Sequence, residues 1–271
     1  MNILYCGDAN VGQGIFLSVL SILKHTERDV DIFILTASID GHMPVGSDFA
    51  DRLRDVIRDK GNGGDVRLFD ITDLFGSCCP EPNMDTRFTP FCMLRLFADL
   101  VPEIPDKVLY LDTDVLCRAP FDDMYDTDVS SVEIAGVPDR YGKWFFGNVL
   151  RHDYFNSGVL LMNMKKIRES GLLAGCREMC RTKKIFMPDQ SSLNKLAVKK
   201  KLPGRYNAQK KIHKKTVFKH FTTYFRYLPK FRPVTIKPWD YDKVHEVLKI
   251  YEFDDIFEEY EKLKEKGNDK R

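Results

Sequence analysis

Two aspartates stand two positions apart directly after an apolar run. Residues 108–111 are apolar, and Asp112-Thr113-Asp114 follows them. The run predicts a buried strand of a parallel sheet, and side chains two apart in an extended chain point the same way. Two carboxylates at one buried spot are costly unless a cation neutralises them. The motif therefore indicates either an Mg²⁺ or Mn²⁺ site that holds a phosphate or a solvated turn at a strand end.

Other polar side chains could join such a site. Asp8 and Asn10 follow the first predicted strand, where they either bind a base or ribose edge or form an Asx-type turn. Arg95 lies in an otherwise apolar helix and needs an anionic partner, either a structural carboxylate or a phosphate or active-site acid. His220 would add a nitrogen ligand to the two aspartates, which favours Mn²⁺ over Mg²⁺.

Three polar segments in the second half are further candidates. The segment Asn156-Ser157 is predicted as a turn and either only connects strands or presents amide and hydroxyl groups to a sugar. Asp189 is expected to cap a helix, with Gln190 in the first turn as a neutral group that can face a reacting carbon without ionising. Lys237, in a Lys-Pro-Trp sequence, either clamps a diphosphate or is a surface lysine beside a buried tryptophan.

The elements that must position these side chains follow from hydrophobic periodicity. Strands are predicted at residues 3–6, 30–35, 66–71, 108–111, 132–137 and 159–163, and helices at 15–23, 48–60, 90–101, 165–183, 188–196 and in the acidic tail after 251. Ser47 and Thr89 are the expected N-caps of two of these helices. Alternating strands and helices predict an open, mostly parallel α/β sheet, in which ligands bind at the carboxyl ends of the strands.

Composition and charge limit the class of protein. The chain has 271 residues, of which 43% are hydrophobic, and we interpret residues 1–240 as one α/β domain and 241–271 as a C-terminal helical extension. A net charge of +2 argues against a dedicated nucleic-acid binder, so no nucleic-acid partner is expected. Without a signal peptide, a long apolar run or a CxxC pair among the seven cysteines, we expect a cytoplasmic protein.

One stretch departs from this balance. Residues 195–232 contain thirteen Lys and Arg and no Asp or Glu, interleaved with aromatic residues. The stretch is a solvated face, an anionic acceptor groove, a membrane-surface patch or an RNA-binding surface. So many uncompensated charges favour association with an anionic glycan or with the inner face of a membrane.

A glycine-rich segment argues against one alternative class of enzyme. Gly12-Gln13-Gly14 begins like a dinucleotide fingerprint but has Leu17 where the third glycine belongs. An NAD-dependent enzyme is therefore disfavoured.

Taken together, the motifs resemble those of glycosyltransferase family 8, the retaining GT-A-type enzymes that include bacterial lipopolysaccharide galactosyl- and glucosyltransferases and glycogenin. The resemblance covers about residues 1–240 and rests on segments 5–10, 94–96, 108–116, 154–163 and 189–194 in that order. One part departs from the family pattern: no glycine follows His220 closely, and sixteen residues separate it from Lys237.

The resemblance implies a GT-A fold and a role for each matching residue. Asp112 and Asp114 would hold Mn²⁺, or alternatively Mg²⁺, on the UDP diphosphate, with His220 as the third ligand. Gln190 matches the residue beneath the anomeric carbon, and Asp189 would stabilise positive charge or position sugar hydroxyls. The other donor-binding residues would be Cys6, Asp8, Asn10, Arg95, Thr113, Asp139, Asn156, Ser157 and Lys237.

The implied activity is retaining transfer of glucose or galactose from a UDP-hexose to a hydroxyl of a glycan or lipid-linked saccharide. The altered loop after His220 leaves a second hypothesis open: a non-catalytic protein that binds a UDP-sugar or an anionic glycan.

Overall fold

A computed structural model describes residues 1–85, 90–142, 153–226 and 232–268 of the chain. Its strands are β1 Asn2–Cys6, β2 Asp31–Thr36, β3 Val66–Asp70, β4 Lys107–Leu111, β5 Val115–Cys117, β6 Ile134–Pro138, β7 Phe155–Asn163, β8 Lys199–Lys201, β9 Phe218–His220, β10 Tyr224–Arg226 and β11 Arg232–Val234. Its α-helices are α1 Gly12–Leu23, α2 Ser47–Asp59, α3 Thr72–Ser77, α4 Asp122–Tyr125, α6 Met164–Ser170, α7 Leu172–Thr182, α8 Pro188–Leu196, α9 Tyr241–Lys243 and α10 Asp254–Asn268. Its 3-10 helices are η1 Ala9–Val11, η2 Glu81–Asn83, η3 Pro90–Leu100 and η4 Gly204–Tyr206. The element η5 Val244–Leu248 is a short π-helix.

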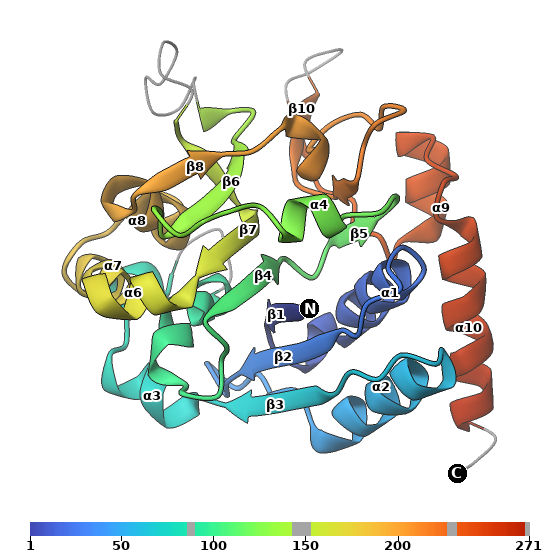
Figure 1. Ribbon diagram of the computed structural model, residues 1–271, viewed down its shortest axis with the longest axis horizontal. Helices are drawn as coiled ribbons and strands as arrows, with labels where there is room; N and C mark the ends of the chain where they lie inside the picture. The colour runs from blue at the N-terminus through green and yellow to red at the C-terminus, as the bar shows by residue number, and fades with distance from the viewer. Residues whose placement is uncertain (86–89, 143–152, 227–231, 269–271) are drawn as a thin grey trace.

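A seven-stranded sheet in the order β3-β2-β1-β4-β7-β6-β8 forms the centre (Figure 1). Strand β7 runs antiparallel to both of its neighbours, and the other pairs in this sheet are parallel. The predicted mostly parallel α/β sheet is confirmed. Two small antiparallel pairs, β5 with β9 and β10 with β11, lie outside it.

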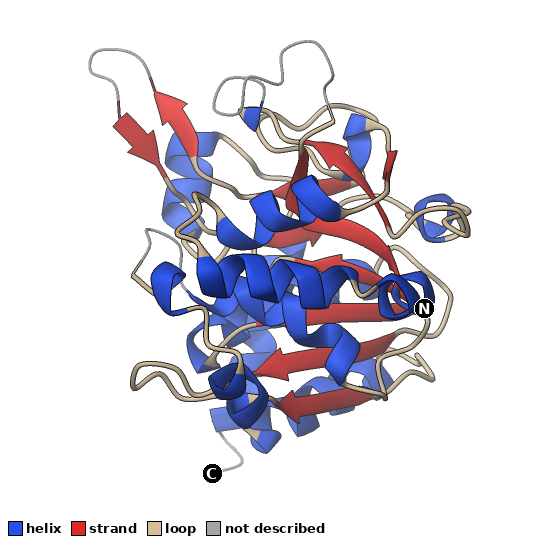
Figure 2. Cartoon of the chain, turned by 90° about the vertical axis from the view of Figure 1, so that its left-hand side faces the viewer, coloured by secondary structure: helices blue, strands red, loops and turns tan. Residues whose placement is uncertain are grey.

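Helices cover both faces of this sheet (Figure 2). In β1, Ile3 and Tyr5 point to one face, whereas Leu4 and Cys6 point to the other. The first face packs against α1, α2 and α10, and the second against η3, α7 and α8. Because apolar groups are buried on both sides, the central strands are apolar throughout their length.

The acidic tail forms α10, which lies beside α1 and α2 (Figure 1). Phe253, Ile256 and Phe257 are buried in the same core as α1. The ring of Tyr260 meets that of Phe16 edge-on, with centroids 5.5 Å apart. The predicted helix after residue 251 is confirmed, whereas the domain boundary at residue 240 stays a prediction.

Two details of helix structure differ from the prediction. Gly46, rather than Ser47, occupies the N-cap position of α2, and Ser47 is its first helical residue. The predicted helix at 165–183 is two helices, because Gly171 has a φ of 71° and interrupts the chain with a left-handed residue. The predicted N-cap Thr89 lies outside the described residues.

The segment Asn156-Ser157-Gly158 is part of β7 and not a turn. A Cβ atom at position 158 would lie 2.2 Å from Cε1 of His220 and 2.6 Å from Oδ2 of Asp112. The glycine therefore marks a close approach of two segments to the strand, which sequence inspection cannot distinguish from a turn glycine. The strand carries Asn156 and Ser157 directly into the site described next.

Candidate functional site

Two adjoining cavities lie at the carboxyl ends of β1 and β4. The smaller has a volume of about 220 Å³ and the larger about 500 Å³, and we call them the sugar-side cavity and the nucleotide-side cavity after the parts of the donor that the family resemblance predicts there. The two share Cys92, Arg95, Asp112, Asp114, Thr223 and Lys237. Cys6, Asp8, Asn10 and Thr113 line the nucleotide-side cavity only, and Asp139, Asn156, Ser157, Asp189, Gln190 and His220 line the sugar-side cavity only. The structure thus brings every predicted site residue together, and their individual roles stay predictions.

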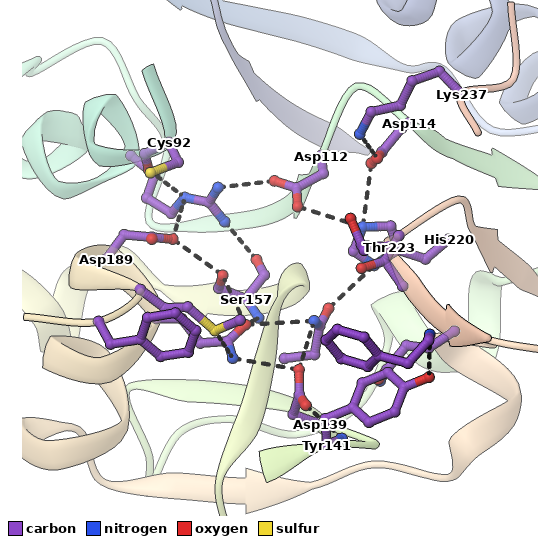
Figure 3. A pocket seen from close by; sticks show the side chains of 18 residues that line it. Cys92, Asp112, Asp114, Asp139, Tyr141, Ser157, Asp189, His220, Thr223 and Lys237 are labelled. Carbon is purple, nitrogen blue, oxygen red and sulfur yellow. Dashed lines mark hydrogen bonds and ion pairs between the residues drawn. The ribbon is translucent and has the colours of Figure 1, made fainter. Parts of the chain in front are cut away.

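Asp112, Asp114 and His220 converge where the cavities meet (Figure 3). One ligand atom from each lies within 4.8 Å of the others. Nε2 of His220 is 3.2 Å from Oδ1 of Asp114 and 3.6 Å from Oδ2 of Asp112. The antiparallel pairing of β5 with β9 sets this geometry, because it places His220 opposite Val115. Two carboxylates and an imidazole suit Mn²⁺, so these residues fit the metal that the sequence predicts.

The ammonium group of Lys237 pairs with one carboxylate of this cluster, that of Asp114. Its Nζ lies 2.5 Å from Oδ2 of Asp114. Burial by itself raises the pKa of Asp114, but the charges of Lys237 and His220 outweigh it and hold that pKa well below its usual range. The loop that departs from the family pattern therefore still brings both His220 and Lys237 to Asp114.

Two buried amides orient the imidazole of His220. Its Nδ1 lies 3.1 Å from Oδ1 of Asn156 and 3.2 Å from Oδ1 of Asn207. Because amide oxygens only accept hydrogen bonds, both amides favour a proton on Nδ1. With the ring oriented in this way, Nε2 faces Asp112 and Asp114, where it could bind a metal ion.

We expect Asn207→Ala to weaken Mn²⁺ binding about 10–100-fold, because losing the second acceptor loosens the ring orientation and tautomer of His220. Calorimetric titration with Mn²⁺ measures this without any turnover. Gln209→Ala is the matched control, since Gln209 is also a buried amide but bonds to the backbone of Pro138 and Arg140. Equal losses of affinity in the two variants would contradict the role of Asn207.

Arg95 is buried and joins three segments of the site. Its guanidinium donates to Oδ1 of Asp112 at 2.8 Å and to the backbone carbonyl of Ser157 at 2.6 Å. It also pairs with Oδ2 of Asp189 at 3.4 Å, and it lies 4.1 Å from the ring centroid of Tyr110. The anionic partners that the sequence required are therefore carboxylates of the site itself.

Asp189 and Gln190 lie in the first turn of α8. The predicted capping role of Asp189 is wrong: Met187 is the N-cap residue, and the Asp189 carboxylate instead accepts from Oγ of Ser157 at 3.1 Å. Oε1 of Gln190 accepts from the backbone N–H of Ser157 at 2.9 Å, and its Nε2 donates to Oδ2 of Asp139 at 3.3 Å. A neutral carboxamide is thus held in place in the sugar-side cavity.

In the nucleotide-side cavity, three polar side chains meet. The carboxylate of Asp8 accepts from Nδ2 of Asn10 at 2.8 Å and lies 2.9 Å from Nδ1 of His42. The ring of His42 in turn meets that of Phe91 edge-on, with centroids 5.5 Å apart. Sequence inspection missed His42, whose only signal is its place in the loop after β2, at the same edge of the sheet.

The glycine-rich segment has a packing role. A Cβ atom on Gly14 would lie 2.4 Å from the carbonyl oxygen of Thr113 and 2.6 Å from the ring of Trp239. Glycine therefore lets α1 approach the turn that carries Asp112 and Asp114. Sequence inspection also missed the cavity-lining residues Cys92, Tyr110, Gln209, Thr222, Thr223 and Thr235.

The basic–aromatic stretch at residues 195–232 does not expose all its aromatic side chains. Tyr206, Phe218 and Phe221 are buried, and the rings of Phe225 and Tyr141 pack edge-on. Residues 227–231, with two further aromatics, lie outside the described residues. No helix in the described part of the chain is long and apolar enough to cross a membrane. Association with a membrane surface stays a prediction.

Lys219 in this stretch is buried, and its Nζ donates to the backbone carbonyls of Ala208, Lys210 and His220. Burial lowers its pKa from 10.5 to about 8. Between these pH values the unfolded chain binds more protons than the folded one. We therefore expect the free energy of unfolding to gain about 3 kcal/mol from this group as the pH rises from 8 to 10.5.

Urea unfolding measures the free energy of unfolding of wild type and of Lys219→Met at each pH in this window. The difference between the two proteins at each pH gives the contribution of Lys219. Lys214→Met, at an exposed lysine of the same stretch, should unfold like wild type at every pH. A difference between wild type and Lys219→Met that stays constant with pH would contradict the expectation.

The doubly covered sheet with an Asp-Thr-Asp turn after β4 has the GT-A architecture. The sequence profile described as Glycosyl transferase family 8 matches residues 2–243, and the chain belongs to this family. Galactosyltransferase LgtC, solved with donor and acceptor sugar analogs, has a TM-score of 0.70 to this chain at 20% identity, covering 95% of this chain and 94% of LgtC. That likeness supports the fold.

Two curated relatives match over shorter regions. The chain is 29% identical over 180 residues to glycosyltransferase GlyF of Streptococcus pneumoniae serotype 4, which is 65% of this chain and 40% of GlyF. It is 35% identical over 91 residues to glucoside xylosyltransferase 1 of Gallus gallus, which is 30% of this chain and 21% of that protein. The chain thus spans less than half the length of either relative.

Proposed function

We propose that this chain transfers glucose or galactose from a UDP-sugar to a hydroxyl of a glycan or lipid-linked saccharide, with retention of the anomeric configuration. One observation carries the proposal: the Asp112–Asp114–His220 cluster lies at the junction of two cavities. This arrangement supports a donor whose diphosphate lies at the cluster. The uridine would then lie toward Cys6, Asp8, Asn10 and Thr113, and the hexose toward Asp139, Asn156, Ser157, Asp189 and Gln190.

Asp112, Asp114 and His220 would hold Mn²⁺, with Mg²⁺ as the alternative ion. The bound ion would supply positive charge that stabilises the departing UDP. In the structure, Lys237 pairs with Asp114. It is therefore close enough to the cluster to contact a diphosphate bound there. Its ammonium group would add to the stabilisation of the leaving group.

The sugar-side residues favour one reaction path. Gln190 is neutral, and its carboxamide is already bonded to Ser157 and Asp139, so it is a poor nucleophile. We therefore favour a path through a short-lived oxocarbenium-like species, in which the bond to UDP breaks, the acceptor hydroxyl attacks on the face that UDP leaves, and the hydroxyl proton passes to the departing diphosphate. Asp189, which Arg95 and Ser157 hold in place, would stabilise the positive charge or position the sugar hydroxyls.

Release of UDP from UDP-glucose and UDP-galactose, measured with Mn²⁺ and with EDTA, tests this proposal. We expect release with at least one donor in Mn²⁺ and none in EDTA. Equal release in EDTA would contradict the metal role. Tight UDP binding without turnover of any donor would instead favour the non-catalytic UDP-sugar or anionic-glycan binding protein.

A further inference from the structure

A hollow of about 430 Å³ lies beside the site, and six basic side chains line it. This basic hollow, as we name it, is formed by Arg140, Arg205, Lys210, Lys211, His213 and Lys215. Buried neutral side chains, Asn207, Gln209 and Thr216, complete its lining. Among the described residues that line it, none is an aspartate or a glutamate.

Among the described residues, most of these basic side chains have no carboxylate partner. Arg205 pairs with Asp123 at 2.8 Å on the surface. Within the described ranges, Lys210, Lys211 and Lys215 form no ion pair, although they stand within six consecutive positions. Like charges gathered around a concave surface repel one another and raise the local concentration of anions. The hollow therefore has the electrostatic character of an anion-binding site.

The basic hollow adjoins the sugar-side cavity. Gln209 lines both of them. Lys210 and Lys211 also line a third, intermediate hollow, which shares Gln209 and Thr222 with the sugar-side cavity. The cavity that holds Gln190 thus lies next to hollows lined by Lys210 and Lys211.

The shape and surroundings favour a discrete ligand over a membrane surface. Membrane-surface segments combine basic residues with exposed aromatic anchors. Among the described residues of this stretch, Tyr206, Phe218 and Phe221 are buried and Tyr224 and Phe225 are half-buried, and the lysines surround a hollow.

We propose that the basic hollow binds a phosphate or carboxylate group of the acceptor saccharide while the acceptor hydroxyl enters the sugar-side cavity. The inference rests on the proposed transfer reaction and narrows its acceptor to an acidic saccharide. Phosphate and carboxylate are treated together because lysine and arginine recognise both.

Binding of three small probes to the Mn²⁺- and UDP-saturated protein tests the proposal. The probes are methyl glucoside, its 6-phosphate and methyl glucuronide, measured by calorimetry at low salt. At least one acidic probe should bind about tenfold more tightly than the neutral one, since several exposed charge pairs each contribute a fraction of a kcal/mol. Comparison of the phosphate with the glucuronide tells which anion the hollow prefers. Added salt should reduce the difference.

The variant Lys210→Glu/Lys211→Glu should lose this preference. Its matched control is Lys165→Glu/Lys183→Glu, which makes the same charge change at two exposed lysines outside the hollow and should keep it. Equal binding of all three probes by wild type, or a preference that survives the Lys210→Glu/Lys211→Glu change, would overturn the proposal. Because both lysines are exposed, thermal unfolding should match wild type.

Two further measurements distinguish the acceptor proposal from the proposed transfer reaction and from a membrane contact. UDP release from the UDP-hexose donors, with water as acceptor, should be the same in wild type and in Lys210→Glu/Lys211→Glu. If wild type releases no UDP but still prefers the acidic probes, the result would contradict the proposed transfer reaction and not the binding of an anion in the hollow. If wild type binds phosphatidylglycerol vesicles through these lysines but shows no preference among the sugars, the hollow is a membrane contact and the acceptor proposal is wrong.

Discussion

Replacing Asp114 by asparagine is expected to lower UDP release from the preferred UDP-hexose by at least about 10²–10³-fold. The carboxylate is buried, lies 3.2 Å from Nε2 of His220 and pairs with Lys237. Asparagine has nearly the same shape but no negative charge, so it cannot neutralise a divalent cation. The measurement is UDP release at saturating donor with Mn²⁺, together with the thermal shift that Mn²⁺ and UDP cause.

Asp126→Asn is the matched control for this variant. Asp126 is 60% exposed and pairs with Arg28 on the surface, so the same chemical change there should leave UDP release at the wild-type rate. Undiminished release by Asp114→Asn, or a full thermal shift with Mn²⁺ and UDP, would show that this cluster is not the metal site.

The second large effect is expected from Arg95→Met, which should lower the free energy of unfolding by about 3–5 kcal/mol. The substitution removes the guanidinium that pairs with Asp112 and Asp189 and leaves these carboxylates without their cation. It also leaves the backbone carbonyl of Ser157 without its donor. Urea unfolding measures the loss of stability, and calorimetric titration measures UDP binding in Mn²⁺.

Arg177→Met separates the structural part of this effect from the functional part. Arg177 also forms a largely buried ion pair, with Asp99, but neither residue lines the two cavities. Arg177→Met should cost a similar amount of stability and keep UDP affinity, whereas Arg95→Met should lose both. Wild-type UDP affinity in folded Arg95→Met would contradict its place in the donor site.

Much of the fold could be predicted because its signals are local. Six of the seven strands of the sheet and α8 follow from runs and periods of apolar residues that lie within one element, whereas the Lys-Lys-Lys strand β8 was not predicted. The two aspartates of the Asp-Thr-Asp turn are two positions apart in the sequence, so an extended chain is enough to point their carboxylates the same way. The prediction of local structure was wrong where one residue type serves two purposes. Gly158 was predicted in a turn, but it lies within β7, where other segments approach the strand closely.

The completed site depends on pairings between distant segments. His220 reaches Asp114 because β9 pairs with β5, and Asn207 reaches His220 from a loop that no local pattern marks. Asp189 was predicted as a helix cap, but packing turns its carboxylate toward Ser157. Amino-acid order sets which residues are neighbours along the chain, so it determined the elements, the acidic motif and the excess of basic residues at 195–232. Sheet register and the packing of loops set distances between residues a hundred positions apart, and only they decided which partners each charged group meets.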